Sequence, residues 1–165
     1  MKIRAFIDAD VAAIYSIQLR CPQAAQWREE DYLRLARESC GTILVAENCT
    51  GNVQEIVGFA AFHRVMDEAE LCNIAVNPAH QRKGVARGLL TAGMSIMRDA
   101  GTRRLFLEVR ASNQAARTFY AAMSFQWLYT RRGYYHNPEE DALVMACDVV
   151  PSISSPNHTP ANMLE

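Results

Sequence analysis

The sequence lacks both a long apolar run and an excess of charge of one sign. Although 50% of its 165 residues are hydrophobic, no stretch approaches the ~20 consecutive apolar residues of a membrane-spanning helix. The 17 Lys and Arg residues nearly balance the 18 Asp and Glu residues, which argues against a general nucleic-acid surface. The N-terminal segment also lacks the apolar core of a secretory signal. We therefore expect a cytoplasmic protein that makes no direct contact with nucleic acid or membrane.

Paired cysteine motifs and regular histidine spacings are absent as well. The cysteines number five, and they are Cys21, Cys40, Cys49, Cys72 and Cys147. An odd count without Cys-x-x-Cys predicts reduced thiols that pack as small apolar side chains. The four histidines show no ligand spacing, so the sequence predicts no metal site.

Hydrophobic periodicity and turn residues predict a single α/β domain over residues 1–150. The predicted strands cover residues 3–6, 42–47, 56–65, 69–76, 104–110, 126–132 and 142–149, the last two as a hairpin with a long loop. The first predicted helix begins near residue 10, and three further helices are predicted over residues 27–38, 82–100 and 113–123. This order predicts a mixed sheet of about seven strands with helices on both faces. Residues 151–165, rich in Pro, Ser and Asn, are predicted to form a disordered tail.

The run Gln81–Ala86 follows an apolar predicted strand and opens a predicted helix. The first N–H groups of a helix have no intrahelical partners and lie at the positive end of its dipole. Gly84 would allow a phosphate to approach the backbone closely, and Arg82, Lys83 and Arg87 add positive charge. A basic turn alone is usually a solvated surface feature, and this one matches neither the P-loop nor the dinucleotide glycine pattern. Its position between strand and helix nevertheless predicts an anion site.

The loop has the form Gln/Arg-x-x-Gly-x-Gly/Ala and resembles the pyrophosphate loop of the GCN5-related N-acetyltransferase (GNAT) family. Other matching segments lie between residues 67 and 147, and they are Asp67–Leu71, Asn73–Pro78, Leu107–Asn113, Phe119–Tyr120, Arg131–Tyr135 and Glu140–Ala142. Within the family they are similar to the enzymes that acetylate the N-terminal alanine of a small-subunit ribosomal protein. The resemblance implies acetyl-CoA as cosubstrate, no metal, and a protein or peptide N-terminus as acceptor.

The resemblance also implies two catalytic residues. Glu108 would be the general base, and a carboxylate suffices because an α-amine has a pKa of about 8. Tyr120 would protonate the departing CoA sulfur. The residues alone allow plainer roles, because Glu108 could be a solvated partner of Arg110 or Arg104, and Tyr120 could be a core aromatic residue.

The binding residues follow from the same resemblance. In the family, the strand containing Ile74, Ala75 and Val76 splays from the Glu108 strand and offers backbone groups to the pantetheine arm. Asn113 would also bind this arm, although it could simply cap its helix. The residues assigned to the pyrophosphate are Arg82, Lys83, Gly84, Val85, Ala86 and Arg87. Trp27 would form one wall of the acceptor groove, and Tyr134 with Tyr135 would form the opposite wall.

Three positions depart from the family pattern. Extra residues separate Pro22 from Trp27, Gly133 stands where the bacterial enzymes usually have Asn, and Ser124 stands where the family has Gly. A left-handed Ser124 would cost roughly 1 kcal/mol. Since the first two departures fall at the acceptor groove, an acetyltransferase for lysine side chains or small amines stays open as an alternative. Two further alternatives are a non-catalytic acetyl-CoA-binding module, against which Glu108 and Tyr120 argue, and a scaffold whose basic loop has no function, against which the loop and its preceding strand argue.

Overall fold

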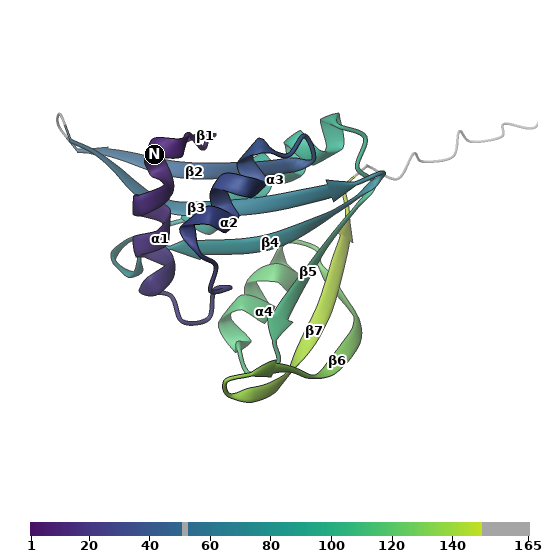
Figure 1. The fold of residues 1–165 in the computed structure, drawn as a ribbon. Coiled ribbons are helices and arrows are strands. Elements are labelled where there is room, and N and C mark those ends of the chain that lie inside the picture. Colours follow the sequence, from purple (N-terminus) through teal and green to yellow (C-terminus); the bar gives the residue numbers. More distant parts are fainter. Residues whose placement is uncertain (51–52, 150–165) are drawn as a thin grey trace, which may run out of the picture.

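The computed structural model describes residues 1–50 and 53–149, and its centre is a seven-stranded sheet in the order β1-β2-β3-β4-β5-β7-β6 (Figure 1). The strands are β1 (Lys2–Ala5), β2 (Gly41–Thr50), β3 (Val53–Val65), β4 (Glu68–Val76), β5 (Arg104–Arg110), β6 (Gln126–His136) and β7 (Glu139–Asp148). Neighbouring strands are antiparallel except β4 and β5, which are parallel. The predicted mixed sheet is confirmed, whereas the predicted tail lies outside the described residues.

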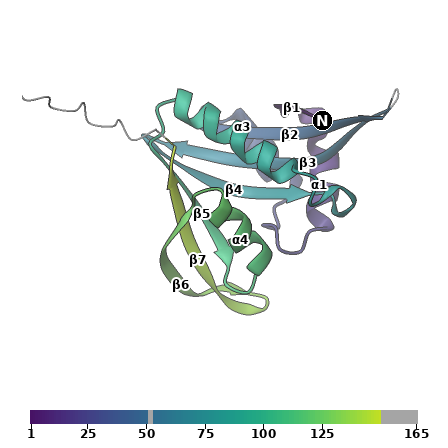
Figure 2. The same ribbon diagram turned by 180° about the vertical axis from the view of Figure 1, so that it is seen from behind.

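Helices cover both faces of the sheet, as the sequence predicted (Figures 1 and 2). α1 (Val11–Leu19) and α2 (Glu29–Arg37) lie on one face, and α3 (Val85–Asp99) and α4 (Gln114–Ala122) lie on the other. Alternation along β3 supplies both cores, because Phe59 packs with Tyr32 in one cluster and Phe62 packs with Leu89 in the other. Two short 3-10 helices, Asp8–Asp10 and Pro78–His80, precede α1 and α3. No helix of the described chain has the length and apolar character needed to cross a membrane.

The structure corrects two predicted boundaries. Only residues 137 and 138 join β6 to β7, so the predicted long hairpin loop is wrong. The β6–β7 register is irregular between Arg131 and Tyr135, where Gly133 adopts φ 59°. This irregularity interrupts the alternation of apolar and polar residues by which a strand is predicted from sequence. α3 begins at Val85 rather than at residue 82, because Gly84 is a left-handed N-cap with φ 83°.

Two residues that follow helices are left-handed, and one of them is Ser124, for which the sequence raised this conformation. Gly101 follows the C-cap of α3 with φ 86°, and Ser124 adopts φ 68° after α4. The Ser124 N–H still donates to the Ala121 carbonyl at 3.0 Å, so the chain reverses there without a glycine. A side chain in this region costs roughly 1 kcal/mol, which affects the stability of the α4–β6 turn rather than the chemistry of the site.

Candidate active site

The site begins where β4 and β5 separate. Within the described chain their parallel pairing covers only Glu68–Glu70 against Arg104–Phe106. β4 then continues beside β3, while β5 continues beside β7, and the two strands diverge with α4 close to the opening (Figure 1). A sheet that splits between parallel strands leaves backbone polar groups without ladder partners, and such groups need another partner. The predicted splay of these strands is confirmed.

The register of β4 shows which backbone groups face the opening. The Asn77 N–H donates to the Val57 carbonyl at 2.8 Å, so these residues form a hydrogen-bonded antiparallel pair. Because such pairs alternate with pairs whose N–H and C=O groups point outward, Ile74 and Val76 direct theirs toward β5. Ala75 lies between them and directs its backbone groups to β3 instead. The predicted backbone donors of this strand are thus reduced from three residues to two.

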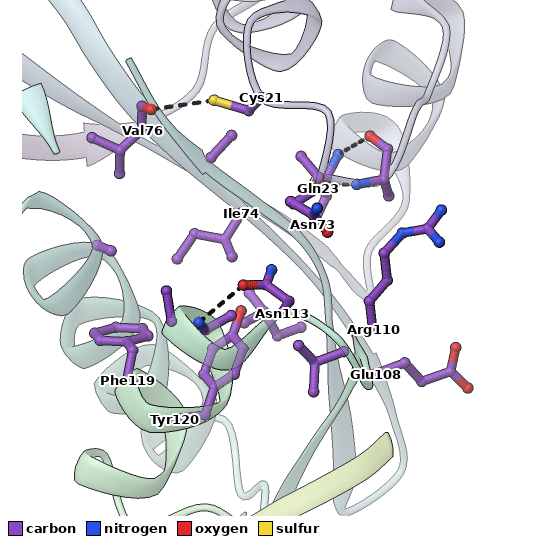
Figure 3. A pocket seen from close by; sticks show the side chains of 18 of the residues that line it. Cys21, Gln23, Asn73, Ile74, Val76, Glu108, Arg110, Asn113, Phe119 and Tyr120 are labelled. Carbon is purple, nitrogen blue, oxygen red and sulfur yellow. Dashed lines mark hydrogen bonds between the residues drawn. The ribbon is translucent and has the colours of Figure 1, made fainter. Parts of the chain in front are cut away.

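Protein groups already use the Val76 carbonyl. Cys21 Sγ donates to it at 3.3 Å (Figure 3), and Gln81 Nε2 donates to it at 3.1 Å. The Cys21 contact comes from the loop after α1, and the Gln81 contact from the turn before α3. These two bonds fix the end of β4, so that the N–H of Val76 keeps a defined direction at the opening.

The loop before α3 has the geometry of an anion site. Gly84 adopts φ 83°, and a Cβ built there would meet nothing within 4 Å, so the space beside its backbone is open. The Gly88 N–H makes an α-helical bond to the Gly84 carbonyl at 2.9 Å, and the N–H groups of the preceding turn point out of the helix end. Arg82 and Arg87 are exposed beside this end. Lys83 instead donates to the Ala79 carbonyl at 2.9 Å.

α4 places the next two candidates. Asn113 caps the helix, because its side-chain oxygen accepts from the Ala116 N–H at 3.1 Å. The capping role considered for this residue is therefore real, while its amide nitrogen stays available for a ligand role. Tyr120 lies two turns later and is only 7% exposed, and its hydroxyl points toward Asn113 (Figure 3). Burial raises the pKa of this phenol, which keeps the hydroxyl protonated as a donor requires.

Glu108 has a different partner from those that the sequence suggested. Its carboxylate pairs with the guanidinium of Arg131 on β6, whereas Arg110 pairs with Glu140 at 3.3 Å and Arg104 with Asp148 at 3.6 Å. The pairing with Arg110 or Arg104 is thus wrong. The Glu108 carboxylate points away from Tyr120 (Figure 3). Hydrogen bonding to Glu108, together with the negative charge of this carboxylate, raises the pKa of the Tyr134 phenol.

Aromatic side chains flank this carboxylate. Tyr134 and Tyr135 pack edge to face with centroids 5.1 Å apart. The guanidinium of Arg131 lies 4.1 Å from the Tyr134 centroid, and that of Arg110 lies 3.9 Å from the Tyr135 centroid. Cation–π contacts at these distances hold the tyrosine rings in place. Across the opening, Trp27 comes from the loop between α1 and α2.

A buried polar network holds the Trp27 loop on β4. Asn73 donates to the Tyr32 hydroxyl at 2.8 Å and to the Ala25 carbonyl at 2.9 Å. Gln18 donates to the Trp27 carbonyl at 2.8 Å and accepts from the Tyr32 hydroxyl. Removing one member would leave buried partners unpaired, at a cost of about 1–3 kcal/mol. The loop is therefore a fixed wall rather than a free surface segment.

One groove of about 1460 Å³ joins these parts. Every candidate residue except Lys83 lines it: Trp27, Ile74, Ala75, Val76, Arg82, Gly84, Val85, Ala86, Arg87, Glu108, Asn113, Tyr120, Tyr134 and Tyr135. Lys83 can contribute only its backbone or its charge. The groove runs from the helix end at Gly84, between β4 and β5, to the aromatic pair on β6.

Sequence reasoning missed two charged residues of this groove region. Glu70 lines the groove, and its pKa is raised by partial burial and by the nearby Glu108 charge. Strand alternation along residues 69–76 was the available signal, since it put Glu70 on the face opposite to buried Leu71. Arg131 lies within a matched segment, but only the folded hairpin brings it to Glu108.

Comparison with known proteins agrees with this geometry. The model of the acetyltransferase (GNAT) family matches residues 11–125. The chain belongs to the GNAT acetyltransferase family. Among curated GNAT relatives, the [ribosomal protein bS18]-alanine N-acetyltransferase of Escherichia coli K12 is 35% identical over 142 residues, which cover 85% of this chain and 92% of the relative. The protein of the same name from Haemophilus influenzae is 41% identical over 96 residues, covering 56% of this chain and 65% of that protein.

Solved GNAT structures share the fold. The crystal structure of the ribosomal-protein-S18-alanine N-acetyltransferase from Escherichia coli matches with a TM-score of 0.77 at 30% identity, covering 93% of this chain and 97% of that one. Ard1 from Thermoplasma volcanium matches with a TM-score of 0.77 at 26% identity, covering 90% of this chain and 97% of that one. The family resemblance inferred from the motifs is therefore confirmed.

Proposed function

We propose that this protein transfers an acetyl group from acetyl-CoA to the N-terminal α-amine of a protein, with a ribosomal protein that begins with alanine as the acceptor. The observation that carries the proposal is a single groove in which a split sheet, an open helix N-terminus, Tyr120 and Glu108 meet two aromatic walls. The names of the relatives support the choice of acceptor.

The residues at one end of the groove fit CoA. The helix end at Gly84 offers N–H groups and open space to a pyrophosphate, and Arg82 and Arg87 add charge. The outward backbone groups of Ile74 and Val76 suit the amides of a pantetheine arm, which pairs with an open strand edge as an extended peptide does. When bound, acetyl-CoA supplies the acetyl group as a thioester; the amine nitrogen forms a bond to the acetyl carbon, and the C–S bond breaks to release CoA.

Glu108 and Tyr120 each carry out one of the two proton transfers. Glu108, acting directly or through water, accepts the proton that the α-amine loses. Arg131 holds the carboxylate on the acceptor side of the groove. Tyr120 keeps its proton because burial raises its pKa, and it donates this proton to the departing sulfur. The outward-facing Val76 N–H would stabilise the charge that develops on the thioester oxygen.

The acceptor enters between Trp27 and the Tyr134–Tyr135 pair. The amine must come within about 3–3.5 Å of the thioester carbon, so a bulky first side chain would hold it away. A small first residue is therefore favoured, and aromatic walls would pack the residues that follow.

Mass spectrometry of a peptide panel incubated with acetyl-CoA tests this proposal. The panel begins with Ala, Ser, Gly, Leu or Glu and is otherwise constant. We expect α-amine acetylation of the Ala, Ser and Gly peptides and at least tenfold less product from the Leu and Glu peptides. Equal product from all five would refute the steric argument.

A further inference from the structure

A cluster of three ligating side chains lies outside the groove. Glu38 follows the end of α2, Cys40 precedes β2, and His63 lies near the end of β3. Cys40 Sγ is 3.2 Å from His63 Nε2, His63 Nε2 is 3.5 Å from Glu38 Oε2, and Cys40 Sγ is 3.9 Å from the same oxygen. We propose that Glu38, Cys40 and His63 form a Zn²⁺ site that is separate from the acetyl-transfer chemistry.

The spacing of these atoms matches a face of a zinc coordination tetrahedron. Zinc binds sulfur at about 2.3 Å and nitrogen or oxygen at about 2.0–2.2 Å, so two ligands at a tetrahedral angle lie about 3.3–3.6 Å apart. The three observed separations, 3.2, 3.5 and 3.9 Å, bracket this range. The sulfur, nitrogen and oxygen therefore need only a few tenths of an ångström of adjustment to share one ion.

The arrangement differs from a catalytic relay. In a Cys-His-acid triad the thiol and the carboxylate contact opposite nitrogens of the imidazole. Here both the thiol and the carboxylate approach Nε2 of His63. Three donor atoms that converge on one point, rather than in a chain, suit a shared cation.

The backbone prepares the site. The Gly41 N–H donates to the Glu38 carbonyl at 3.0 Å, and the Arg64 N–H donates to the Cys40 carbonyl at 2.8 Å. Gly41 also lies directly opposite His63 in the β2–β3 ladder. The ligand set is thus held by the sheet and a tight turn, so metal binding would order few additional residues.

Access and charge also favour a cation. The His63 side chain is 35% exposed and that of Glu38 is 40% exposed, so an ion can enter and a water can complete its coordination. Neighbouring arginines are engaged elsewhere, because Arg37 pairs with Asp8 at 3.3 Å and Arg64 donates to the Met66 carbonyl at 3.1 Å.

Metal titration of the full-length protein tests the proposal. The reduced, chelator-treated protein is titrated with Zn²⁺ against a chromophoric chelator, and with Co²⁺ as a spectroscopic substitute. We expect one tight site per chain and a thiolate-to-cobalt charge-transfer band in the near ultraviolet. Cys40→Ser should abolish the band, and both Cys40→Ser and His63→Gln should weaken Zn²⁺ binding at least tenfold.

Matched variants separate this site from other ligands. Cys49→Ser and His136→Gln change exposed side chains of the same types elsewhere in the sheet and should leave both readouts unchanged. Far-ultraviolet circular dichroism of every variant tests whether it is folded. Absence of the cobalt band in the folded wild type, or its persistence in Cys40→Ser, would overturn the proposal.

Discussion

The two ends of the groove are built in different ways. The proposed pyrophosphate-binding part of the CoA end consists of one short stretch of chain, from β4 through the Gly84 turn into α3, and it presents mainly backbone groups. The acceptor end joins the loop before α2 to β6, which are about a hundred residues apart in the sequence, and it is held by side-chain contacts. Backbone-built sites follow from local sequence, whereas side-chain-built walls follow from tertiary packing.

Substitutions at the two ends should therefore change different kinetic and binding constants. Changes at the CoA end should alter acetyl-CoA affinity, and changes at the acceptor end should alter turnover or the KM for peptide. Substitutions at each end, with matched controls, test this difference.

The largest effect is expected for Glu108→Gln, which keeps the shape of the side chain and removes its basicity. We expect kcat to fall by about 10²-fold or more at neutral pH, with nearly unchanged acetyl-CoA affinity. The loss should shrink above pH 8, because an α-amine with a pKa of about 8 then deprotonates unaided. Steady-state kinetics from pH 6.5 to 9.5 measure both features.

Glu68→Gln is the matched control for Glu108→Gln, because Glu68 is an exposed carboxylate on β4 that does not line the groove. It should keep wild-type kinetics. If Glu108→Gln also retained wild-type turnover at neutral pH, Glu108 would be left with only its ion pair to Arg131.

Gly84→Asp should come next, with a loss of acetyl-CoA affinity of about tenfold to a hundredfold by calorimetry, equivalent to about 1.4–2.8 kcal/mol. The new carboxylate would repel the phosphates and fill the open space beside the backbone. Gly101→Asp is a close control, since Gly101 has φ +86° and equally open surroundings but lies away from the groove. Equal affinity in both variants would remove the pyrophosphate assignment.

Tyr120→Phe should lower kcat by about tenfold, which is less than a typical general acid contributes. The demand is small because a thiol with a pKa of about 8.5 is already a fair leaving group. Tyr129→Phe, at a 55% exposed position outside the groove, is the control. A drop in melting temperature with unchanged kcat would instead identify Tyr120 as a core residue.

Trp27→Ala should have the smallest effect, a rise of about fivefold to tenfold in the KM for peptide, because truncating an interface aromatic residue costs about 1 kcal/mol or more. Acetyl-CoA affinity should not change. Trp127→Ala alters an exposed tryptophan on β6 outside the groove and should leave KM unchanged. A loss of acetyl-CoA affinity in Trp27→Ala would break the division between the two ends.

The sequence predicted most of the sheet and the strand-turn-helix around Gly84 because their signals are local. Hydrophobic alternation identified β5, and the glycine between an apolar strand and an amphipathic segment indicated the turn that opens α3. It missed the Glu108–Arg131 pair and the end of β6, because an irregular register near Gly133 interrupts the alternation and the pairing depends on how the hairpin folds. The sequence also did not indicate the Glu38–Cys40–His63 cluster, because these residues come together only when β2 pairs with β3.

The choice of acceptor amine is the most direct test of the proposed N-terminal acetylation. Two peptides compete in one reaction at pH 7.5: one begins with a free alanine and lacks lysine, and the other has a blocked N-terminus and one internal lysine. Because a lysine amine has a pKa of about 10.4 against about 8 for an α-amine, and because the proposed acceptor entry favours an amine at a chain end, we predict that mass spectrometry will find acetylation almost entirely on the alanine peptide. Equal or faster acetylation of the blocked lysine peptide would contradict the N-terminal assignment.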